Sequence, residues 1–353
     1  MIYLFMVMFM KLRMPSYCKD FKCKGEKCKD NCCIGWEIDI DNCSAEYYKS
    51  VKGDFGERLR QGINEGEVPC FKMQGERCVF LNERNLCDII INLGENALCQ
   101  ICRDHPRYFE WFETVKEGGV GLCCEEGARL IISNNQRFSF YDVPCDDEGE
   151  DDYSAQLYEC LLYGREQIIN MLDDESLPLS VRLSSVMSFA HSLQVNVDNY
   201  DYSKINCQVS REKLPINIER LIHHLGAFEV IDESWGEYIK LLIKSAGEIQ
   251  KLMATPPAYS ERISKYLKNI AIYFIWRYFM KGVFDEEILS KVWLSVASCQ
   301  IIGGMFCHAF IQGEELTEES CACLAKNYSK EVEYSQENTD RLCDIIYSIE
   351  MQG

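Results

Sequence analysis

Cysteine is the residue that most constrains what this chain can fold into. The chain has 21 cysteines in 353 residues, and thirteen of them lie between residues 18 and 124. Disulfides fit poorly, because the total is odd, no export signal is evident, and two pairs are adjacent, Cys32-Cys33 and Cys123-Cys124. Thiolates held by a metal in a reducing compartment fit better, and packing with free thiols is the third alternative.

The cysteines form short groups whose spacing lets several sulfurs converge on one centre. Tetrahedral zinc and iron–sulfur clusters both require such convergence. His105, three residues after Cys102, is either a further ligand or a structural histidine. Four ligands are expected from the following candidates: Cys23, Cys28, Cys32, Cys33, Cys78, Cys87, Cys99, Cys102, Cys123 and Cys124.

The charge of the chain excludes some classes of partner. Acidic residues number 56 against 37 basic ones, which gives a net charge of −19. Nucleic acid and anionic membranes both favour positive proteins, so neither is expected as a partner. No apolar run in the sequence predicts a membrane span, which takes roughly 20 residues. With the reducing compartment inferred from the cysteines, these features predict a cytoplasmic protein.

Composition changes along the chain and predicts a mainly α fold in two domains. Residues 14–145 form a cysteine-rich, loop-rich metal-binding domain, and residues 146–152 form an acidic linker. Residues 153–353 read as an all-α helical domain. Predicted helices cover residues 153–172, 181–193, 237–253, 260–281 and 288–310, and the clearest strand signal is at 137–141. The aromatic stretch at 273–279 is assigned to the core of this domain.

The first thirteen residues are interpreted separately. Residues 1–10 are mostly apolar, but no positive charge precedes them and no small-residue cleavage site follows. Met14 reads like a natural start, so residues 1–13 are expected to be a mis-annotated leader. The alternative is a short apolar helix packed on the surface.

The cysteine groups resemble those of a known family. Residues 30–41, 78–83, 86–89, 98–107 and 122–126 resemble the flagellin lysine-N-methylases, as does the late segment 328–335. The likeness spans most of residues 14–345 and is densest among the cysteines. The cysteine core is also similar to a wider family of zinc- or iron-chelating domains, and the shared positions would be Cys32, Cys33, Cys78, Cys87 and Cys102.

The resemblance implies a specific activity. It implies transfer of a methyl group from S-adenosylmethionine to lysine side chains of flagellin, with a 4Fe-4S cluster in the enzyme. The residues by themselves leave zinc open as the metal. They also leave open a zinc- or iron-chelating binding or sensor protein without catalysis.

Methyl transfer to lysine requires a group that takes a proton, because an ammonium has no lone pair. Glu125 and Glu126 follow Cys124 directly and are the candidate catalytic residues. The alternative is that both simply open a helix, where the macrodipole favours acidic side chains. Acidic residues outnumber basic ones by 34 to 18 over residues 146–353. This excess either recruits a lysine-bearing substrate or keeps the chain soluble.

Overall fold

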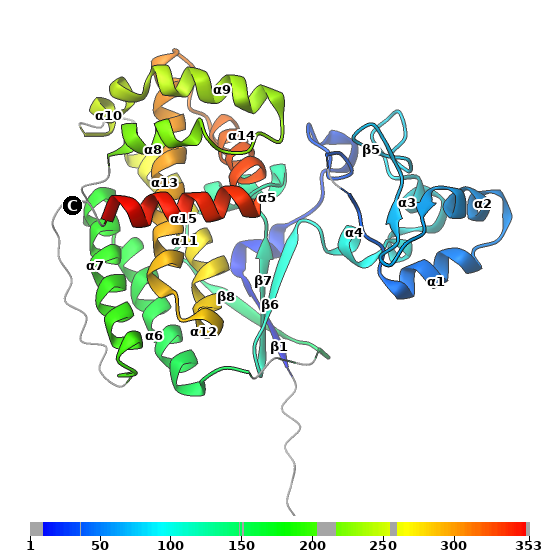
Figure 1. The fold of residues 1–353 in the computed structure, drawn as a ribbon, viewed down its shortest axis with the longest axis horizontal. Coiled ribbons are helices and arrows are strands. Elements are labelled where there is room, and N and C mark those ends of the chain that lie inside the picture. Colours follow the sequence, from blue (N-terminus) through cyan, green and yellow to red (C-terminus); the bar gives the residue numbers. More distant parts are fainter. Residues whose placement is uncertain are drawn as a thin grey trace, which may run out of the picture. The chain divides into compact units, whose positions relative to one another are not determined.

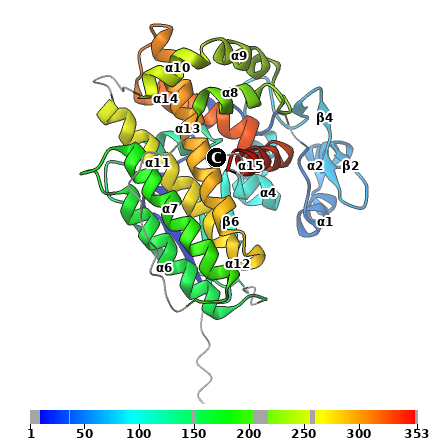
Figure 2. The same cartoon turned by 60° about the vertical axis from the view of Figure 1, so that its left-hand side comes forward.

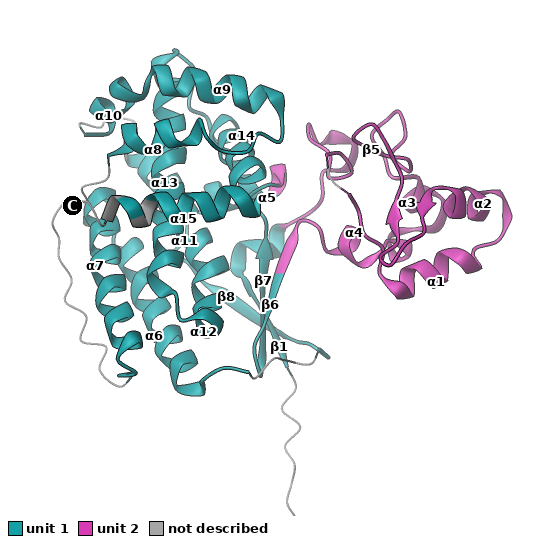
Figure 3. Cartoon of the chain, in the orientation of Figure 1, with its two compact units in different colours: residues 1–20, 109–123, 127–353 teal, residues 21–108, 124–126 magenta. Residues whose placement is uncertain are grey.

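A computed structural model describes residues 10–35, 37–147, 149, 152–202, 217–254 and 260–350. The chain divides into two compact units (Figure 3). Unit 1 comprises residues 1–20, 109–123 and 127–353, and unit 2 comprises residues 21–108 and 124–126. Helices predominate, as the sequence predicts. The units differ from the expected domains, because three segments of the expected cysteine-rich domain, 14–20, 109–123 and 127–145, fall in unit 1 with the helices.

Unit 1 contains a four-stranded sheet, most of which was not predicted from the sequence. Its order is β6-β7-β1-β8, with β1 parallel to β7 and antiparallel to β8. The strands are β1 (Lys11–Pro15), β6 (Arg107–Trp111), β7 (Val115–Val120) and β8 (Phe140–Pro144). The strand expected at 137–141 is therefore displaced toward β8. The other strands carry no clear alternation of apolar and polar residues, and β7 contains two glycines.

Residues 11–13, which the sequence suggested were part of a leader, form three of the five residues of β1. Lys11 pairs with Val115 on one side and with Pro144 on the other. Arg13 makes two hydrogen bonds to the carboxylate of Asp142, at 2.8 and 3.0 Å. These residues therefore lie inside the sheet, between two hydrogen-bonded neighbours.

The helices of unit 1 agree with most of the predicted ones. The predicted helix at 237–253 is two helices, because α9 ends before Ser245, which caps it. Helices α8, α14 and α15 were not predicted, and the last two have mixed polar composition. The helices are α5 (Glu125–Ser133), which begins in unit 2, α6 (Ala155–Leu172), α7 (Leu179–Asp198), α8 (Ile218–Leu225), α9 (Glu233–Lys244), α10 (Ala246–Ala254), α11 (Ser260–Tyr278), α12 (Gly282–Asp285), α13 (Ile288–Ile311), α14 (Glu318–Tyr328) and α15 (Gln336–Glu350), with a π-helical turn η5 (Ser329–Glu333) and 3-10 turns at Ser16–Asp20 and Phe279–Lys281.

Helix α13 is the centre of the bundle. It packs against α7, α8, α10, α11, α14 and α15, and it lies among them in both views (Figures 1 and 2). In the part of the chain that the structure describes, it is the one helix long and apolar enough to cross a membrane. However, 83% of its most apolar window is buried inside the protein. Helix α13 is apolar because its side chains pack against the neighbouring helices.

A buried ion pair fastens the sheet to the helices. Arg165 of α6 donates two hydrogen bonds to Glu117 of β7, at 2.5 and 2.6 Å, and both side chains are 5% exposed. The guanidinium lies 4.4 Å from the ring centroid of Trp276, whose Nε1 donates to the carbonyl of Gly118 at 3.0 Å. Strand β7 and helices α6 and α11 therefore share one core.

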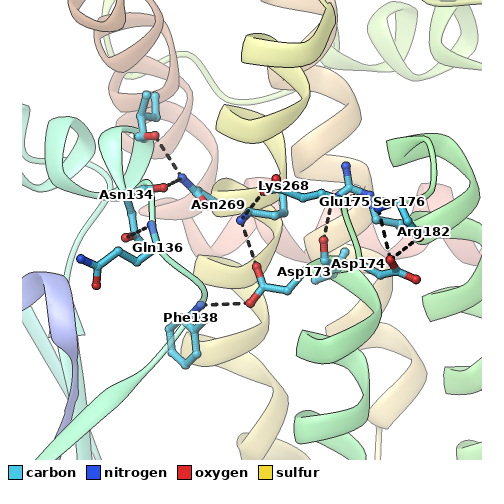
Figure 4. Close-up of polar contacts among 12 residues, drawn as sticks. Asn134, Gln136, Phe138, Asp173, Asp174, Glu175, Ser176, Arg182, Lys268 and Asn269 are labelled. Carbon is cyan, nitrogen blue, oxygen red and sulfur yellow. Dashed lines mark hydrogen bonds and ion pairs between the residues drawn. The ribbon is translucent and has the colours of Figure 1, made fainter.

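A second polar cluster ties the segment before β8 to the bundle (Figure 4). Lys268 of α11 is 2% exposed, and its ammonium lies 2.9 Å from Asp173 and 3.3 Å from Glu175. The other oxygen of Asp173 accepts the amide of Phe138 at 3.0 Å. Asn269 donates to the carbonyls of Ile132 and Asn134. The carboxylates neutralise a lysine that would otherwise be buried without a partner.

Unit 2 is small and is built from short elements. Its core contains Ile38, Tyr48, Phe71 and Phe80, each at most 1% exposed. The helices are α1 (Asn42–Ser50), α2 (Gly53–Gln61), α3 (Asp88–Leu93) and α4 (Gln100–Asp104), with 3-10 turns at Gly25–Lys27 and Glu95–Ala97; the strand pairs are β2 (Ile63–Asn64) with β3 (Cys70–Phe71) and β4 (Met73–Gln74) with β5 (Arg77–Cys78). With so little regular structure, the unit depends on its turns and on its small apolar core.

A chain shortened to begin at Met14 should be less stable than the full chain. The deletion removes Lys11 to Arg13, which hydrogen-bond on both sides within the sheet. At about 1 kcal/mol per lost hydrogen bond, the free energy of unfolding should fall by about 3 kcal/mol or more. Urea unfolding followed by circular dichroism measures this. A chain beginning at Met10 is the control, because it keeps all of β1. Equal stability of the two shortened chains would show that these three residues are dispensable.

Candidate metal centre and buried polar network

Six cysteines of unit 2 gather at its core and are called the thiol group: Cys32, Cys33, Cys78, Cys87, Cys99 and Cys102. Cys33 interacts electrostatically with Cys32, Cys78 and Cys87. Cys102 interacts with Cys99, Cys33 and Cys87. The structure therefore brings together cysteines that lie up to 70 residues apart in the sequence, and it includes all five positions that the chelating domains would share.

The local backbone explains how these residues meet. The amide of Cys78 donates to the carbonyl of Cys33 at 3.0 Å, which joins the first two cysteine segments. Cys87 forms a β-bridge with Leu81 across a turn, in which Asn85 adopts a positive φ of 57°. Cys99 caps the N-terminus of α4, so Cys102 follows on its first turn. Helical spacing places residues three apart on one face, which explains the Cys-x2-Cys hook.

Burial and mutual contact hold most of the thiol group in the neutral form. Burial raises the pKa of Cys78 to about 11 and also raises the pKa of Cys87. Hydrogen bonding to Cys99 and burial raise the pKa of Cys102 far above its ordinary range. Cys32 and Cys99 differ. A hydrogen bond from Cys33 lowers the pKa of Cys32 to about 7, and a hydrogen bond from Cys102 lowers the pKa of Cys99. Several thiolates can coexist here only beside a cation that compensates their charge.

The thiol group fits a metal centre in donor chemistry. Sulfur donors from separate segments are the ligands of structural zinc and of iron–sulfur clusters. Across the described ranges, however, no three side chains of ligand type stand close enough together to hold one metal ion. The thiol group therefore supplies the right type of ligand, but its side chains do not form a closed coordination sphere.

The other candidate cysteines lie outside the thiol group. Cys28 interacts with Cys124 and with Glu125 in unit 2. The sulfur of Cys23 accepts the amide of Gly25, and Cys123, in unit 1, hydrogen-bonds with Tyr334. The ten candidates thus fall into separate environments. His105 is the residue at which α4 ends.

The two candidate catalytic glutamates open α5. Glu125 accepts hydrogen bonds from the ammonium of Lys24 and the amide of Lys29, each at 2.8 Å. Although burial opposes it, these donors hold the pKa of the Glu125 carboxyl below its ordinary value. Glu126 is 8% exposed and lies 3.6 Å from Lys24. Both carboxylates therefore have a local structural role at the start of the helix.

Unit 1 contains a buried polar network that the sequence analysis missed. The carboxylate of Glu333, in η5, is fully buried. It accepts hydrogen bonds from the hydroxyls of Tyr273 (2.8 Å) and Tyr278 (3.1 Å) and from Arg277 (2.8 Å), and Ser329 donates to its other oxygen. Arg277, the one cation in the aromatic stretch at 273–279, is the sequence signal that could have revealed this network.

The buried charges of Glu333 and Arg277 stabilise each other. Burial, followed by the nearby Glu333 charge, raises the pKa of Tyr278 well above its ordinary range. Burial disfavours the charged form of Arg277, but Glu333 outweighs it and keeps the guanidinium charged. The carboxylate of Glu333 accepts hydrogen bonds both from α11 and from Ser329 of its own turn, so the network joins α11 to η5.

The structure is that of a mainly helical, cysteine-rich protein. Unit 2 contains the thiol group as a candidate metal centre, and unit 1 is a helical bundle with a buried polar network. A family profile described as "FliB lysine N-methylase C-terminal domain" matches residues 165–352, more than half of the chain. The chain belongs to the flagellin lysine N-methylase family.

Individual relatives are more distant. The chain is 26% identical over 129 residues to proteins named "Lysine-N-methylase" from Salmonella choleraesuis and Salmonella typhimurium. That alignment covers 34% of this chain and 32% of each relative, so it spans about a third of their length. The chain is also 26% identical over 129 residues to "Flagellar biosynthetic protein FliU" of Salmonella muenchen, and this alignment covers 76% of that protein. No solved structure matches the chain.

Replacing Glu125 with Gln should destabilise the protein near neutral pH by about 1–2 kcal/mol, because a charged partner of Lys24 is lost. The folded-state pKa of Glu125 is lowered, so its contribution is present above the unfolded pKa of about 4.3. It is lost as pH falls through the folded value. The difference between parent and Glu125→Gln should therefore close below about pH 4. Urea unfolding at several pH values tests this, with the exposed Glu26→Gln as control. A pH-independent difference would contradict the assigned ion pair.

Proposed function

We propose that this protein is a protein-lysine N-methyltransferase that methylates lysine side chains of flagellin with S-adenosylmethionine as donor. The observation that supports it most is the family match over residues 165–352. Relatives named lysine-N-methylase and flagellar biosynthetic protein add support. The free thiols among the described residues suit a reducing compartment, and we place the protein in the cytoplasm.

The proposed reaction has simple requirements. The lone pair of a neutral lysine amine attacks the methyl carbon, the carbon–sulfur bond breaks, and S-adenosylhomocysteine leaves. The substrate lysine begins as an ammonium, with a pKa of about 10.4, and must first lose a proton. Glu125 and Glu126 remain the proposed acceptors of that proton. Glu125 already accepts hydrogen bonds from Lys24 and Lys29. We therefore prefer Glu126 as the proton acceptor.

We propose further that the thiol group holds a 4Fe-4S cluster, with zinc as the alternative. Four of its six sulfurs would serve as ligands, and the raised pKa values of Cys78 and Cys87 are what uncompensated thiols show when packed together. When bound, the centre would supply positive charge and join the four cysteine segments of unit 2. An open iron site would additionally suit the amino and carboxylate groups of S-adenosylmethionine.

Purified protein, incubated with S-adenosylmethionine and flagellin, should increase the mass of flagellin by whole methyl groups located on lysines. Peptide mass spectrometry measures this, and reactions without S-adenosylmethionine are the control. A protein that binds metal but leaves flagellin unmodified under reducing, anaerobic conditions would point instead to a chelating or sensor protein. That outcome would contradict the proposed enzyme.

Replacing Cys33 or Cys102 with Ser should remove most of the bound metal. Each substitution removes one sulfur of the thiol group, and structural metal sites rarely retain affinity with a ligand missing. Elemental analysis and the absorption spectrum of anaerobically purified protein measure the effect. Cys43→Ser is the matched control, because Cys43 is an exposed thiol of the same unit. Full metal content in both test variants would place the centre elsewhere.

A further inference from the structure

A small cavity of about 170 Å³ lies in unit 1, at the start of α9. Its walls come from α9, α13, α14 and η5, and they include Trp235, Tyr238, Met305 and Glu331. Pockets for drug-sized ligands measure roughly 300–1,000 Å³. This cavity is smaller, so it suits one side chain better than a whole nucleoside cosubstrate.

The two carboxylates of η5 have opposite electrostatic environments. Glu333 faces Arg277 and three hydroxyls, as described above. Glu331 is 4% exposed and accepts only the amides of Ile231 and Asp232, both at 3.0 Å. Within the described residues it forms no ion pair. Asp232 repels its negative charge, and the attraction from Lys330 is weaker than that repulsion. A buried carboxylate in this state is stabilised by an incoming cation.

The remaining walls of the cavity are also suited to a cation on an apolar stem. The rings of Trp235 and Tyr238 stack with centroids 5.7 Å apart. Indole and phenol faces attract ammonium groups, and Met305 offers apolar surface to methylenes. The hydroxyl of Tyr238 is buried and, in the described part of the chain, has no hydrogen-bond partner. Such a group is satisfied when a ligand supplies one.

We propose that this cavity is a recognition site for a lysine side chain of the protein substrate, whose ammonium lies between Glu331 and the aromatic pair Trp235 and Tyr238. The inference rests on the proposed function, because it assumes a lysine-bearing substrate. It adds a specificity site in the helical unit that is separate from both the thiol group and the Glu125–Glu126 pair. Asp232 and Lys330 also line the cavity; the first adds negative charge that favours the ammonium, and the second adds positive charge that opposes it.

The test uses the full chain labelled with 5-fluorotryptophan. The chain has five tryptophans, and the spectrum of Trp235→Phe assigns the reporter resonance. Nα-acetyl-lysine N-methylamide should shift that resonance saturably. The norleucine analogue, which ends in a methyl group instead of the terminal ammonium, should leave it in place. The other tryptophan resonances report whether each variant is folded.

Glu331→Gln and Tyr238→Phe should each weaken the binding of the lysine amide by roughly tenfold, as expected for loss of a hydrogen bond to a charged group. Tyr238→Phe keeps the ring and its packing, so it tests the site even if Glu331→Gln is poorly folded. Glu237→Gln is the control, because Glu237 is an exposed carboxylate of the same helix that does not line this cavity.

Equal shifts with the lysine and norleucine amides, or unchanged affinity in folded Glu331→Gln and Tyr238→Phe, would overturn the proposal. Flagellin methylation is measured separately on the same preparations. Methylation without lysine binding at Trp235 would retain the enzyme and reject this site. Lysine binding without methylation would retain the site and reject the enzyme.

Discussion

The buried pair between Glu117 and Arg165 is the interaction on which the architecture of unit 1 depends. It joins a strand that comes early in the chain to the first helix of the bundle, and Trp276 covers the guanidinium from a third element. Removing one partner of such a pair typically costs about 3–5 kcal/mol, because the other charge stays buried. The pair therefore fixes which helix face meets β7, and it explains why residues 10–20 and 109–123 belong to the helical unit.

Unit 2 depends on a different kind of constraint. Its helices and strands are short, and its apolar core is small for the length of chain that it orders. The thiol group fills the rest of that core with side chains that cannot all ionise in the absence of a cation. A unit of this kind would be completed by the metal centre that we propose, whereas unit 1 neutralises most of its buried charges with its own side chains.

The π-helical turn η5 gives its two carboxylates different environments. Single π turns often occur at functional sites, because they change the direction of successive side chains. Here Glu333 bonds to α11, while Glu331, two residues earlier, bonds to the start of α9. One carboxylate is fully neutralised and holds two helices together. The other is left with a charge to compensate beside an aromatic cavity, and we assign a role in substrate recognition to that one.

The sequence by itself determined the main helices of unit 1 and the concentration of cysteines between residues 18 and 124, because both can be recognised from local sequence. Apolar periodicity placed α6, α7, α11 and α13 correctly, and Cys99 and Cys102 share a helix turn. Only the tertiary structure decided that Lys11–Pro15 pairs with β7 and β8, since strands as short as these carry little pattern of their own. It alone also placed Cys33, Cys78 and Cys87 together and, among the residues that the structure describes, left Glu331 without an ion pair. Such relations join residues far apart in the chain, and packing fixes them where local spacing cannot.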